Sequence, residues 1–323
     1  MGWRIVYIEE SDSVSSYLDN VKIKRAADEI LIPYKDIHTL IIDNYKTFLT
    51  TNFLIKCAEN KVNLIICGLE HLPIASVTPI SGNSQSPIIL KKQIEWKEKI
   101  KQLVHKVIIK GKINNQRQVL EKYDMNKDVI AKLCQFCSEV KEGDITNREG
   151  LSAKMYFREL FGKEFIRFSD DVINYALNYG YTIMRTQISK VLISKGLTPS
   201  LGFFHRGTNN DFNLSDDIIE VFRPIIDDYV YKNMIKKEIF TRSDRMNLIK
   251  LTTKNMKYRN QNNTFLNVIN LYVNEILDKI ESGQIEEIEI PQFINYDIWL
   301  YEITFIFRFA NGISKREENL FRF

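Results

Sequence analysis

The chain has 323 residues, a length that allows about two domains and a sizeable hydrophobic core. Hydrophobic residues make up 44% and charged residues 27% of it, which excludes disorder as its main state. The 13 glycines and 7 prolines are about half of the usual share of these turn-forming residues, which disfavours a β-sandwich or barrel. The net charge is only +4, so any nucleic-acid surface must come from local basic patches.

The first 80 residues have the pattern of a small β-rich domain with one helix. Asp19 and Asn20 predict a hairpin turn, and Thr50 predicts the N-cap of a short amphipathic helix that ends at Asn60. Short apolar runs predict strands over Arg4–Ile8, Val14–Leu18, Val21–Lys24, Glu29–Pro33, His38–Asp43, Asn63–Cys67 and Ile74–Thr78. We expect residues 1–80 to fold as one β-rich domain.

Residues 81–90 are expected to link this domain to a larger, all-helical domain over 91–297. The link is small and polar and contains Pro87. Apolar spacing predicts helices over Lys91–Lys110, Val119–Val140, Asn147–Phe161 and Ser169–Lys195, and a further one that begins at Ser215. In the first of these, the expected apolar stripe is Ile94, Ile100, Leu103 and Val107. Pro224 should kink the last helix, and the expected fold class is α+β.

The cysteines and the N-terminal residues favour a reducing compartment. Cys57 and Cys67 lie in apolar runs, and the pair Cys134 and Cys137 lacks the second pair of ligands that a structural zinc site needs. The first residues lack the pattern of a signal peptide, and no apolar run approaches the roughly 18 residues of a membrane span. We therefore expect a cytoplasmic protein that does not associate with a membrane.

Glu149 is the first candidate for chemistry. On a helix that starts near Asn147, it shares one face with Ala153, Tyr156 and Leu160, so a carboxylate stands at the end of an apolar stripe. The simpler interpretation is an acid in the first turn that complements the helix dipole.

A second candidate lies around His205. This histidine follows Gly202 in a loop, and Asp217 and Glu220 are three residues apart on the expected helix beyond it. One imidazole with two carboxylates is a ligand set that suits Mn²⁺ or Mg²⁺ better than structural zinc. An ordinary loop histidine beside helix-start acids explains the same residues equally well.

Basic residues are concentrated in two stretches. Residues 91–117 hold eight lysines and one arginine against Glu95 and Glu98, and residues 232–259 hold nine basic residues against Glu238 and Asp244. Basic helices can bind the phosphates of DNA without reading its sequence. A solvated helix face would have the same composition.

Four blocks in order resemble the signature of one family, the CRISPR-associated integrase, which is the universal endonuclease of spacer acquisition. They are Glu149–Phe157, Leu177–Tyr181, Gly196–His205 and Asp216–Pro224. The segments Cys67–Pro73 and Phe293–Tyr296 also resemble that family. The resemblance covers roughly residues 4–297, and it is strongest to the type II systems, which use a single large RNA-guided nuclease.

The resemblance implies a β-rich domain that forms a homodimer, joined to a helical catalytic domain. It implies metal ligands at Glu149, His205 and Glu220, with Asp217 as a supporting or alternative ligand, and Mg²⁺ or Mn²⁺ as the ion. It also implies that two dimers flank a dimer of a small ferredoxin-like CRISPR protein, bind prespacer and repeat DNA, and work with the type II effector nuclease. Residues 298–323 extend beyond the segment that the resemblance explains.

The implied activity is metal-dependent cleavage and integration of DNA. A 3′-hydroxyl of a short foreign fragment attacks a phosphodiester of the CRISPR array, and the fragment becomes a new spacer in antiviral defence. Near the metal, Lys154, Arg158 and Arg223 are expected to contact phosphates, and Arg242, Arg245 and Lys250 to hold the duplex. The alternatives are a non-catalytic DNA-binding scaffold and a general branched-DNA phosphodiesterase of repair.

Overall fold

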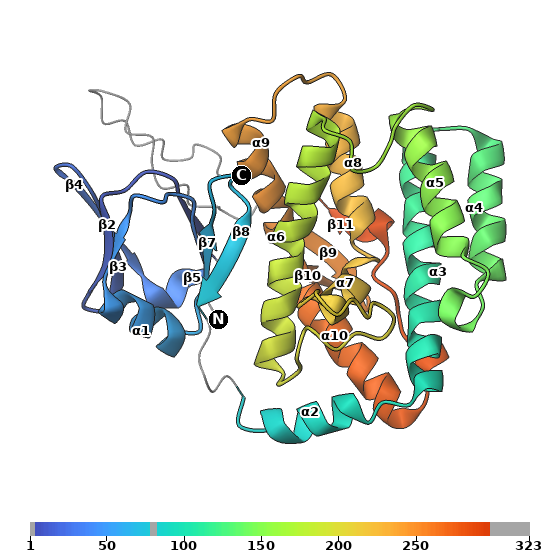
Figure 1. The fold of residues 1–323 in the computed structure, drawn as a ribbon, viewed down its shortest axis with the longest axis horizontal. Coiled ribbons are helices and arrows are strands. Elements are labelled where there is room, and N and C mark those ends of the chain that lie inside the picture. The colour runs from blue at the N-terminus through green and yellow to red at the C-terminus, as the bar shows by residue number, and fades with distance from the viewer. Residues whose placement is uncertain (1–3, 78–82, 298–323) are drawn as a thin grey trace. The chain divides into compact units, whose positions relative to one another are not determined.

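The computed structural model describes residues 4–77 and 83–297 (Figure 1). These two ranges form two compact units, one before and one after residues 78–82 in the chain. The N-terminal unit is rich in strands and the C-terminal unit is mainly helical, so the expected α+β class is confirmed. The expected tail over 298–323 lies outside the described residues, as does Thr78 at the end of one expected strand.

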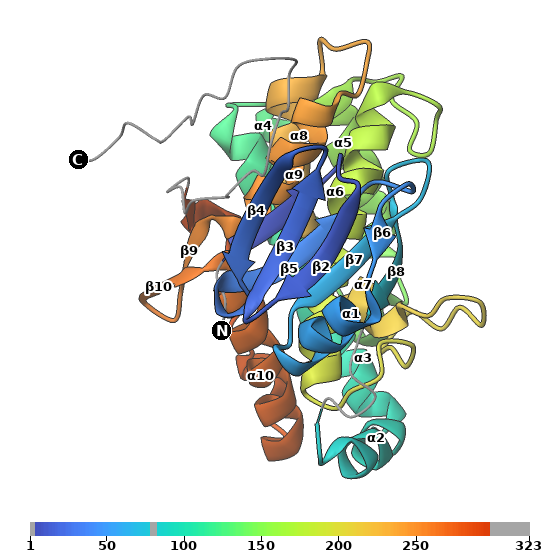
Figure 2. The ribbon, with the colours of Figure 1, turned by 90° about the vertical axis from the view of Figure 1, so that its left-hand side faces the viewer.

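Over residues 4–77 the N-terminal unit is built from two four-stranded sheets and one α-helix (Figure 2). One sheet has the order β1-β5-β7-β8, in which β8 alone is antiparallel to its neighbour, and the other has the order β4-β3-β2-β6. The elements are β1 (Arg4–Ile8), β2 (Ser13–Tyr17), β3 (Asn20–Arg25), β4 (Asp28–Pro33), β5 (Ile37–Ile42), β6 (Phe48–Leu49), α1 (Thr51–Glu59), β7 (Asn63–Cys67) and β8 (Pro73–Val77).

The core of this unit joins apolar residues of both sheets with Phe53 and Cys57 of α1. The Thr50 side chain accepts a hydrogen bond from the backbone N–H of Phe53, which confirms the expected cap. The hairpin also forms, but Tyr17 pairs with Asn20, so its turn is Leu18–Asp19, one residue earlier than expected. Leu18 takes a φ of 51° there. Leucine rarely adopts this conformation, so the sequence does not predict a turn at this residue.

The C-terminal unit contains nine helices and one small sheet among its described residues. The helices are α2 (Ser86–Ile94), α3 (Glu98–Lys122), α4 (Lys127–Glu139), α5 (Arg148–Phe161), α6 (Val172–Ser194), α7 (Asn213–Ile219), α8 (Arg223–Met234), α9 (Arg242–Lys250) and α10 (Phe265–Ser282). Helix α2 starts inside the expected linker 81–90, because Pro87 fits the first turn of a helix. The helix expected over Lys91–Lys110 is two helices, which meet at residues 95–97.

The sequence predicted an all-helical C-terminal domain, but this unit also contains a small sheet. Strands β9 (Asn255–Tyr258), β10 (Gln261–Thr264) and β11 (Tyr296–Asp297) form an antiparallel sheet in the order β10-β9-β11. These strands have two to four residues and are rich in asparagine, so they lack the apolar alternation that identifies a strand.

The helix expected from Ser215 through Pro224 is two helices. Helix α7 begins earlier, at Asn213, and ends at Ile219, while Pro224 lies in the first turn of α8. Proline has no backbone N–H, which a residue in a helix interior needs for its hydrogen bond but a residue in the first turn does not. Pro224 therefore begins a new helix instead of bending a continuous one.

Helix α3 contacts α4, α5, α7 and α8 and is central to the unit. Its buried face is not the expected stripe: Ile100, Leu103 and Val107 are only half-buried, and the buried positions include Val104, His105, Ile108 and Lys112. Four polar side chains of this helix are therefore buried: His105, Lys112, Asn115 and Gln116. None of the helices in the described ranges has the length and apolar character needed to span a bilayer.

Candidate metal and DNA site

Glu149 lies in the first turn of α5, where the backbone is held firmly. Asp144 accepts hydrogen bonds from the N–H groups of Arg148 and Glu149, both at 2.8 Å, and the Asn147 side chain accepts one from Gly150. These bonds satisfy the free N–H groups of the helix start. The Glu149 side chain is thereby released from capping the helix and can turn toward α3.

Glu220 directly follows α7, and its side chain is only 5% exposed. Its Oε1 atom accepts a hydrogen bond from Arg223 Nε at 2.8 Å. Burial alone would raise the pKa of this carboxyl, but Arg223 and Lys112 outweigh it and lower the pKa below its ordinary value. Glu220 is therefore an anion at neutral pH.

Lys112 of α3 joins the two glutamates. Its Nζ atom lies 2.7 Å from Glu149 Oε1 and 2.5 Å from Glu220 Oε2, and its side chain is 10% exposed. Burial lowers the pKa of Lys112, but Glu220 and Glu149 outweigh it and raise the pKa to about 12. Burial raises the pKa of Glu149, but Lys112 and His105 together outweigh burial and lower the pKa below its ordinary value. Two carboxylates, 71 positions apart in the chain, thus share one ammonium group.

His205 is held in place by hydrogen bonds to Asp217 of α7. The Asp217 carboxylate accepts hydrogen bonds from the N–H groups of Phe203, Phe204 and His205, and its Oδ1 atom lies 2.7 Å from His205 Nδ1. A Cβ on Gly202 would lie 2.7 Å from Asp217 Oδ2, so the loop needs glycine there. The bond to Asp217 raises the pKa of His205 above its ordinary value and leaves Nε2 as the ring nitrogen that can bind a ligand.

The loop that carries His205 packs on α3 beside Glu149. The ring of Phe204 stacks on that of His105, with 3.8 Å between centroids, and His105 Nε2 lies 3.8 Å from Glu149 Oε2. His205 is therefore linked to Glu149 through one pair of stacked rings. Glu220 also contributes to the raised pKa of His205.

The predicted convergence of Glu149, His205 and Glu220 is met for the two glutamates. Among the described residues, no three His, Cys, Asp or Glu side chains gather closely enough to hold a metal ion. Glu220 Oε2 is buried, and its contact with Lys112 Nζ is an ion pair. Two anionic oxygens of this kind, with an imidazole on the adjoining loop, fit the donor preferences of Mg²⁺ and Mn²⁺.

Asp217 bonds to the loop that carries His205. It was predicted as a supporting or alternative metal ligand, but its oxygens accept three backbone N–H groups and face His205. Its side chain is 1% exposed. In this arrangement the lone pairs of the carboxylate are used by the loop, so Asp217 positions the histidine.

The expected DNA contacts fall into three groups. Lys154 and Arg158 are exposed on α5, as a phosphate contact requires. Arg223 is engaged by Glu220 and lies over the ring of Tyr181, with its Cζ atom 4.5 Å from the ring centroid. On α9, Arg242 and Lys250 are half-buried, and Arg245 is only 8% exposed, so Arg245 is wrong as a surface clamp. Helix α9 packs against α6, and charge alone does not show which residues of α9 this contact buries.

The sequence analysis did not identify Lys112 or His105 as site residues. Lys112 was counted only as one basic residue among those of 91–117. The available signal was its spacing: His105, Ile108, Lys112 and Asn115 recur at the intervals of one helix face, so a charge lies where apolar residues are expected.

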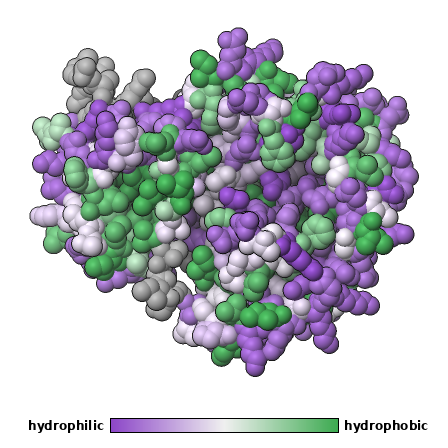
Figure 3. All heavy atoms as spheres, in the orientation of Figure 1, coloured by the Kyte–Doolittle hydropathy of each residue, from purple (hydrophilic) through white to green (hydrophobic). Residues whose placement is uncertain are grey.

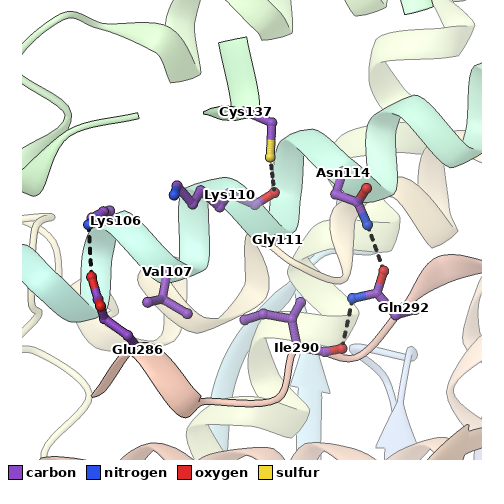
Figure 4. Close-up of a pocket in the computed structure, with 9 residues that line it drawn as sticks. All are labelled: Lys106, Val107, Lys110, Gly111, Asn114, Cys137, Glu286, Ile290 and Gln292. Atoms are coloured by element: carbon purple, nitrogen blue, oxygen red, sulfur yellow. Dashed lines mark hydrogen bonds and ion pairs between the residues drawn. The ribbon is translucent and has the colours of Figure 1, made fainter. Parts of the chain in front are cut away.

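A cavity of about 460 Å³ lies along α3 and is separate from these residues (Figure 4). Lys106, Lys110 and Asn114 line it from α3, and Glu286 and Gln292 line it from the C-terminal segment. Lys106 pairs with Glu286, and Asn114 donates a hydrogen bond to Gln292. None of the predicted ligands is among the residues that line this cavity.

Comparison with known proteins identifies the class. The family model described as CRISPR associated protein Cas1 matches residues 6–259. A CRISPR-associated endonuclease Cas1 from Neisseria meningitidis serogroup C is 30% identical over 306 residues, covering 94% of this chain and 100% of that protein.

Two solved structures share the fold. A casposase bound to integration product has a TM-score of 0.67 at 22% identity, covering 94% of this chain and 96% of its own. A partial Cas6-RT-Cas1–Cas2 complex has a TM-score of 0.62 at 17% identity, covering 90% of this chain and 98% of its own.

These matches define a CRISPR-associated nuclease and integrase, as the four sequence blocks predicted. The chain belongs to the Cas1 family.

Proposed function

We propose that this chain inserts short foreign DNA fragments into a CRISPR array as new spacers and that the reaction depends on Mg²⁺ or Mn²⁺. The observation that carries the proposal is the meeting of Glu149 and Glu220 at one buried cation, beside an anchored histidine. Acidic pairs of this kind are the usual ligands of the ions that support phosphoryl transfer. Membership of the Cas1 family supports the same reading.

Glu149, Glu220 and Nε2 of His205 would hold the ion, which would supply charge stabilisation at the phosphate and acidity at the attacking hydroxyl. Asp217 holds His205 in one orientation and one tautomer through Nδ1. Arg223, fixed by Glu220 and Tyr181, adds a second positive charge beside the site.

The proposed reaction is a transesterification. The 3′-hydroxyl of the fragment attacks a phosphorus atom at the repeat boundary, one P–O bond forms as another breaks, and the cut strand leaves with a new 3′-hydroxyl. The number of phosphodiesters is unchanged, so no nucleotide cofactor is required. With water in place of the hydroxyl, the same residues would catalyse the endonuclease reaction.

We also propose that the N-terminal unit forms the homodimer and that the dimers bind a dimer of a small ferredoxin-like CRISPR protein. Apolar side chains gather on the visible face of this unit (Figure 3). The exposed large apolar side chains of this unit include Leu18, Tyr45, Phe48, Leu69 and Ile74. Exposed apolar patches mark interfaces. The shared fold with a structure described as a Cas1–Cas2 complex supports the partner.

Further proposals follow from the family. Prespacer and repeat DNA would be held at phosphates by Lys154 and Arg158, which are exposed on α5. We further propose that the chain is of the type II subtype, that it works with the effector nuclease of that subtype, and that it acts in the cytoplasm.

Strand transfer tests the function. Labelled short duplexes with free 3′-hydroxyls are mixed with a supercoiled plasmid that carries a repeat, together with the small partner protein and either Mn²⁺ or EDTA. We expect label to enter the plasmid only with Mn²⁺, and not with the His205→Ala variant. If label never enters although the protein still shifts DNA in EDTA, a non-catalytic scaffold replaces the integrase. Label that enters plasmids with and without a repeat equally would favour a general phosphodiesterase.

A further inference from the structure

The position between the two glutamates is filled by a side chain of the protein itself. Lys112 Nζ lies within ion-pair distance of both Glu149 and Glu220, and the three side chains come from three segments, α3, α5 and the residues after α7. No glutamate oxygen could move toward a divalent ion without changing its distance to this ammonium group. The residue thus bears directly on the proposed function, on which this inference rests.

We propose that the Lys112 ammonium is the internal counter-ion of the site: it holds Glu149 and Glu220 together when no divalent ion is bound, and an incoming ion must displace it. Two like charges that face each other in a buried site repel strongly, and a single positive charge between them removes that repulsion. A divalent ion between the same oxygens would repel the ammonium in turn. Lys112 and the ion therefore compete for one place.

The surroundings of Lys112 limit what else can perform this task. Arg223 reaches Glu220 Oε1, the other oxygen of that carboxylate, and itself lies over Tyr181. His105 lies 3.8 Å from Glu149 Oε2, again the other oxygen. Among the described residues, the two oxygens that face each other, Glu149 Oε1 and Glu220 Oε2, have Lys112 as their shared cation.

Competition predicts opposite effects on metal affinity and on stability without metal. Replacing Lys112 by Met keeps a long unbranched side chain and removes the charge. In EDTA, Lys112→Met should melt several degrees below the wild type, because two buried carboxylates lose their counter-ion. Its dissociation constant for Mn²⁺, measured by electron paramagnetic resonance, should fall at least tenfold, because the ion no longer displaces an ammonium group.

A purely structural lysine would give a different pattern. Its loss would lower the melting temperature and leave Mn²⁺ affinity unchanged or weaker, and that result would overturn the proposal. Lys106→Met is the matched control, since Lys106 lies on the same helix and pairs with the exposed Glu286. It should change neither the Mn²⁺ dissociation constant nor the melting temperature in EDTA appreciably.

Two further variants keep the proposal testable and separate it from the proposed function. In Lys112→Met/Glu149→Gln the original net charge returns, so the melting temperature in EDTA should recover above that of Lys112→Met; no recovery would contradict the counter-ion role. Glu149→Gln and Glu220→Gln alone should abolish Mn²⁺ binding. If they bind Mn²⁺ like the wild type, the metal site of the proposed function fails. If they lose it while Lys112→Met binds as the wild type does, only the counter-ion proposal fails.

Discussion

Asp217 Oδ1 lies 2.7 Å from His205 Nδ1, and the same carboxylate accepts the backbone N–H groups of residues 203–205. One buried acid therefore fixes both the loop and the histidine that it carries. The arrangement decides which ring nitrogen can bind a ligand, because Nδ1 is bonded to Asp217 and Nε2 is the other ring nitrogen. Asp217 thus acts through His205 and not as a ligand of its own.

Asp217→Asn should therefore affect the site through His205. The amide removes the negative charge, so the pKa of His205 should fall toward its ordinary value, which NMR titration of the ring protons in EDTA measures. Strand transfer should decrease at least tenfold, because the imidazole loses its fixed orientation. An unchanged pKa would show that Asp217 does not control the histidine.

The same pair makes stability depend on pH in a defined direction. The folded protein holds the His205 proton more tightly than the unfolded chain, so this contribution is full below the unfolded pKa of 6.5 and is lost as pH rises through the raised folded value. Urea unfolding in EDTA from pH 5 to pH 9 should show less of this loss in Asp217→Asn than in the wild type. Equal pH profiles of the two proteins would contradict the assignment.

Glu220→Gln should destabilise the metal-free protein more than Glu149→Gln does. Glu220 is 5% exposed and neutralises both Lys112 and Arg223, whereas Glu149 is 20% exposed. We expect a loss of about 3 kcal/mol for Glu220→Gln and about 1 kcal/mol for Glu149→Gln in urea unfolding at pH 7.

Both carboxyls have lowered pKa values, so their stabilisation is present above the ordinary pKa of 4.5 and is lost as pH falls through the folded values. The difference between wild type and Glu220→Gln should shrink accordingly in acid. Glu281→Gln, which removes an exposed partner of Lys92, is the control and should cost less than about 1 kcal/mol. Equal losses for Glu220→Gln and Glu281→Gln would refute the buried pairing.

A buried acid near the site gives a further pH prediction. Asp227 of α8 is 1% exposed and accepts a hydrogen bond from Tyr181, and burial raises its pKa to about 7. The folded pKa of Asp227 is above its unfolded value. Its contribution to the free energy of unfolding is therefore fully present below about pH 3.8 and is lost as the pH rises through about 7. Asp227→Asn should remove this decline in calorimetric melting curves. A decline of wild-type size in that variant would assign it to other groups.

Gly111 gives a prediction about packing on α3. A Cβ at this position would lie 2.5 Å from Ile290 Cγ2, across the cavity wall shown in Figure 4. Gly111→Ala should therefore cost about 1–3 kcal/mol in spite of the better helix propensity of alanine. The double variant Gly111→Ala/Ile290→Ala should cost less than the sum of its single variants, since it removes the clash. Strict additivity in urea unfolding would exclude this clash as the cause.

Lys154 and Arg158 test the proposed DNA surface. Each is exposed on α5, so Lys154→Ala and Arg158→Ala should each reduce the slope of log affinity against log salt by about one, with the melting temperature unchanged. Lys127→Ala, an exposed charge on α4, is the matched control. If all three variants bind short duplexes with the wild-type salt dependence, α5 is not part of the DNA surface.

The sequence predicted the strands of the N-terminal unit well, because their apolar runs and the Thr50 cap are local signals. It also placed Glu149 at the start of a helix, which the hydrogen bonds of Asp144 and Asn147 explain. The break between α7 and α8 was missed because a proline inside a helical pattern is ambiguous between a kink and a new first turn.

The surroundings of the site could not be predicted in the same way. That Lys112 meets Glu149 and Glu220 depends on how three segments pack, and no spacing along the chain encodes that distance. Arg245 was misplaced for a similar reason, since charge alone does not show which face of α9 is buried. The role of Asp217 became apparent only from the hydrogen bonds of the loop before α7.

The most direct test of the account is the location of the metal ion. Crystals grown with Mn²⁺ would be measured for anomalous scattering at the manganese edge. We predict one peak within ligand distance of Glu149, Glu220 and Nε2 of His205, with Asp217 still bonded to Nδ1 and Lys112 displaced from between the glutamates. A peak bound by Asp217 in place of His205, or one away from both glutamates, would contradict the account.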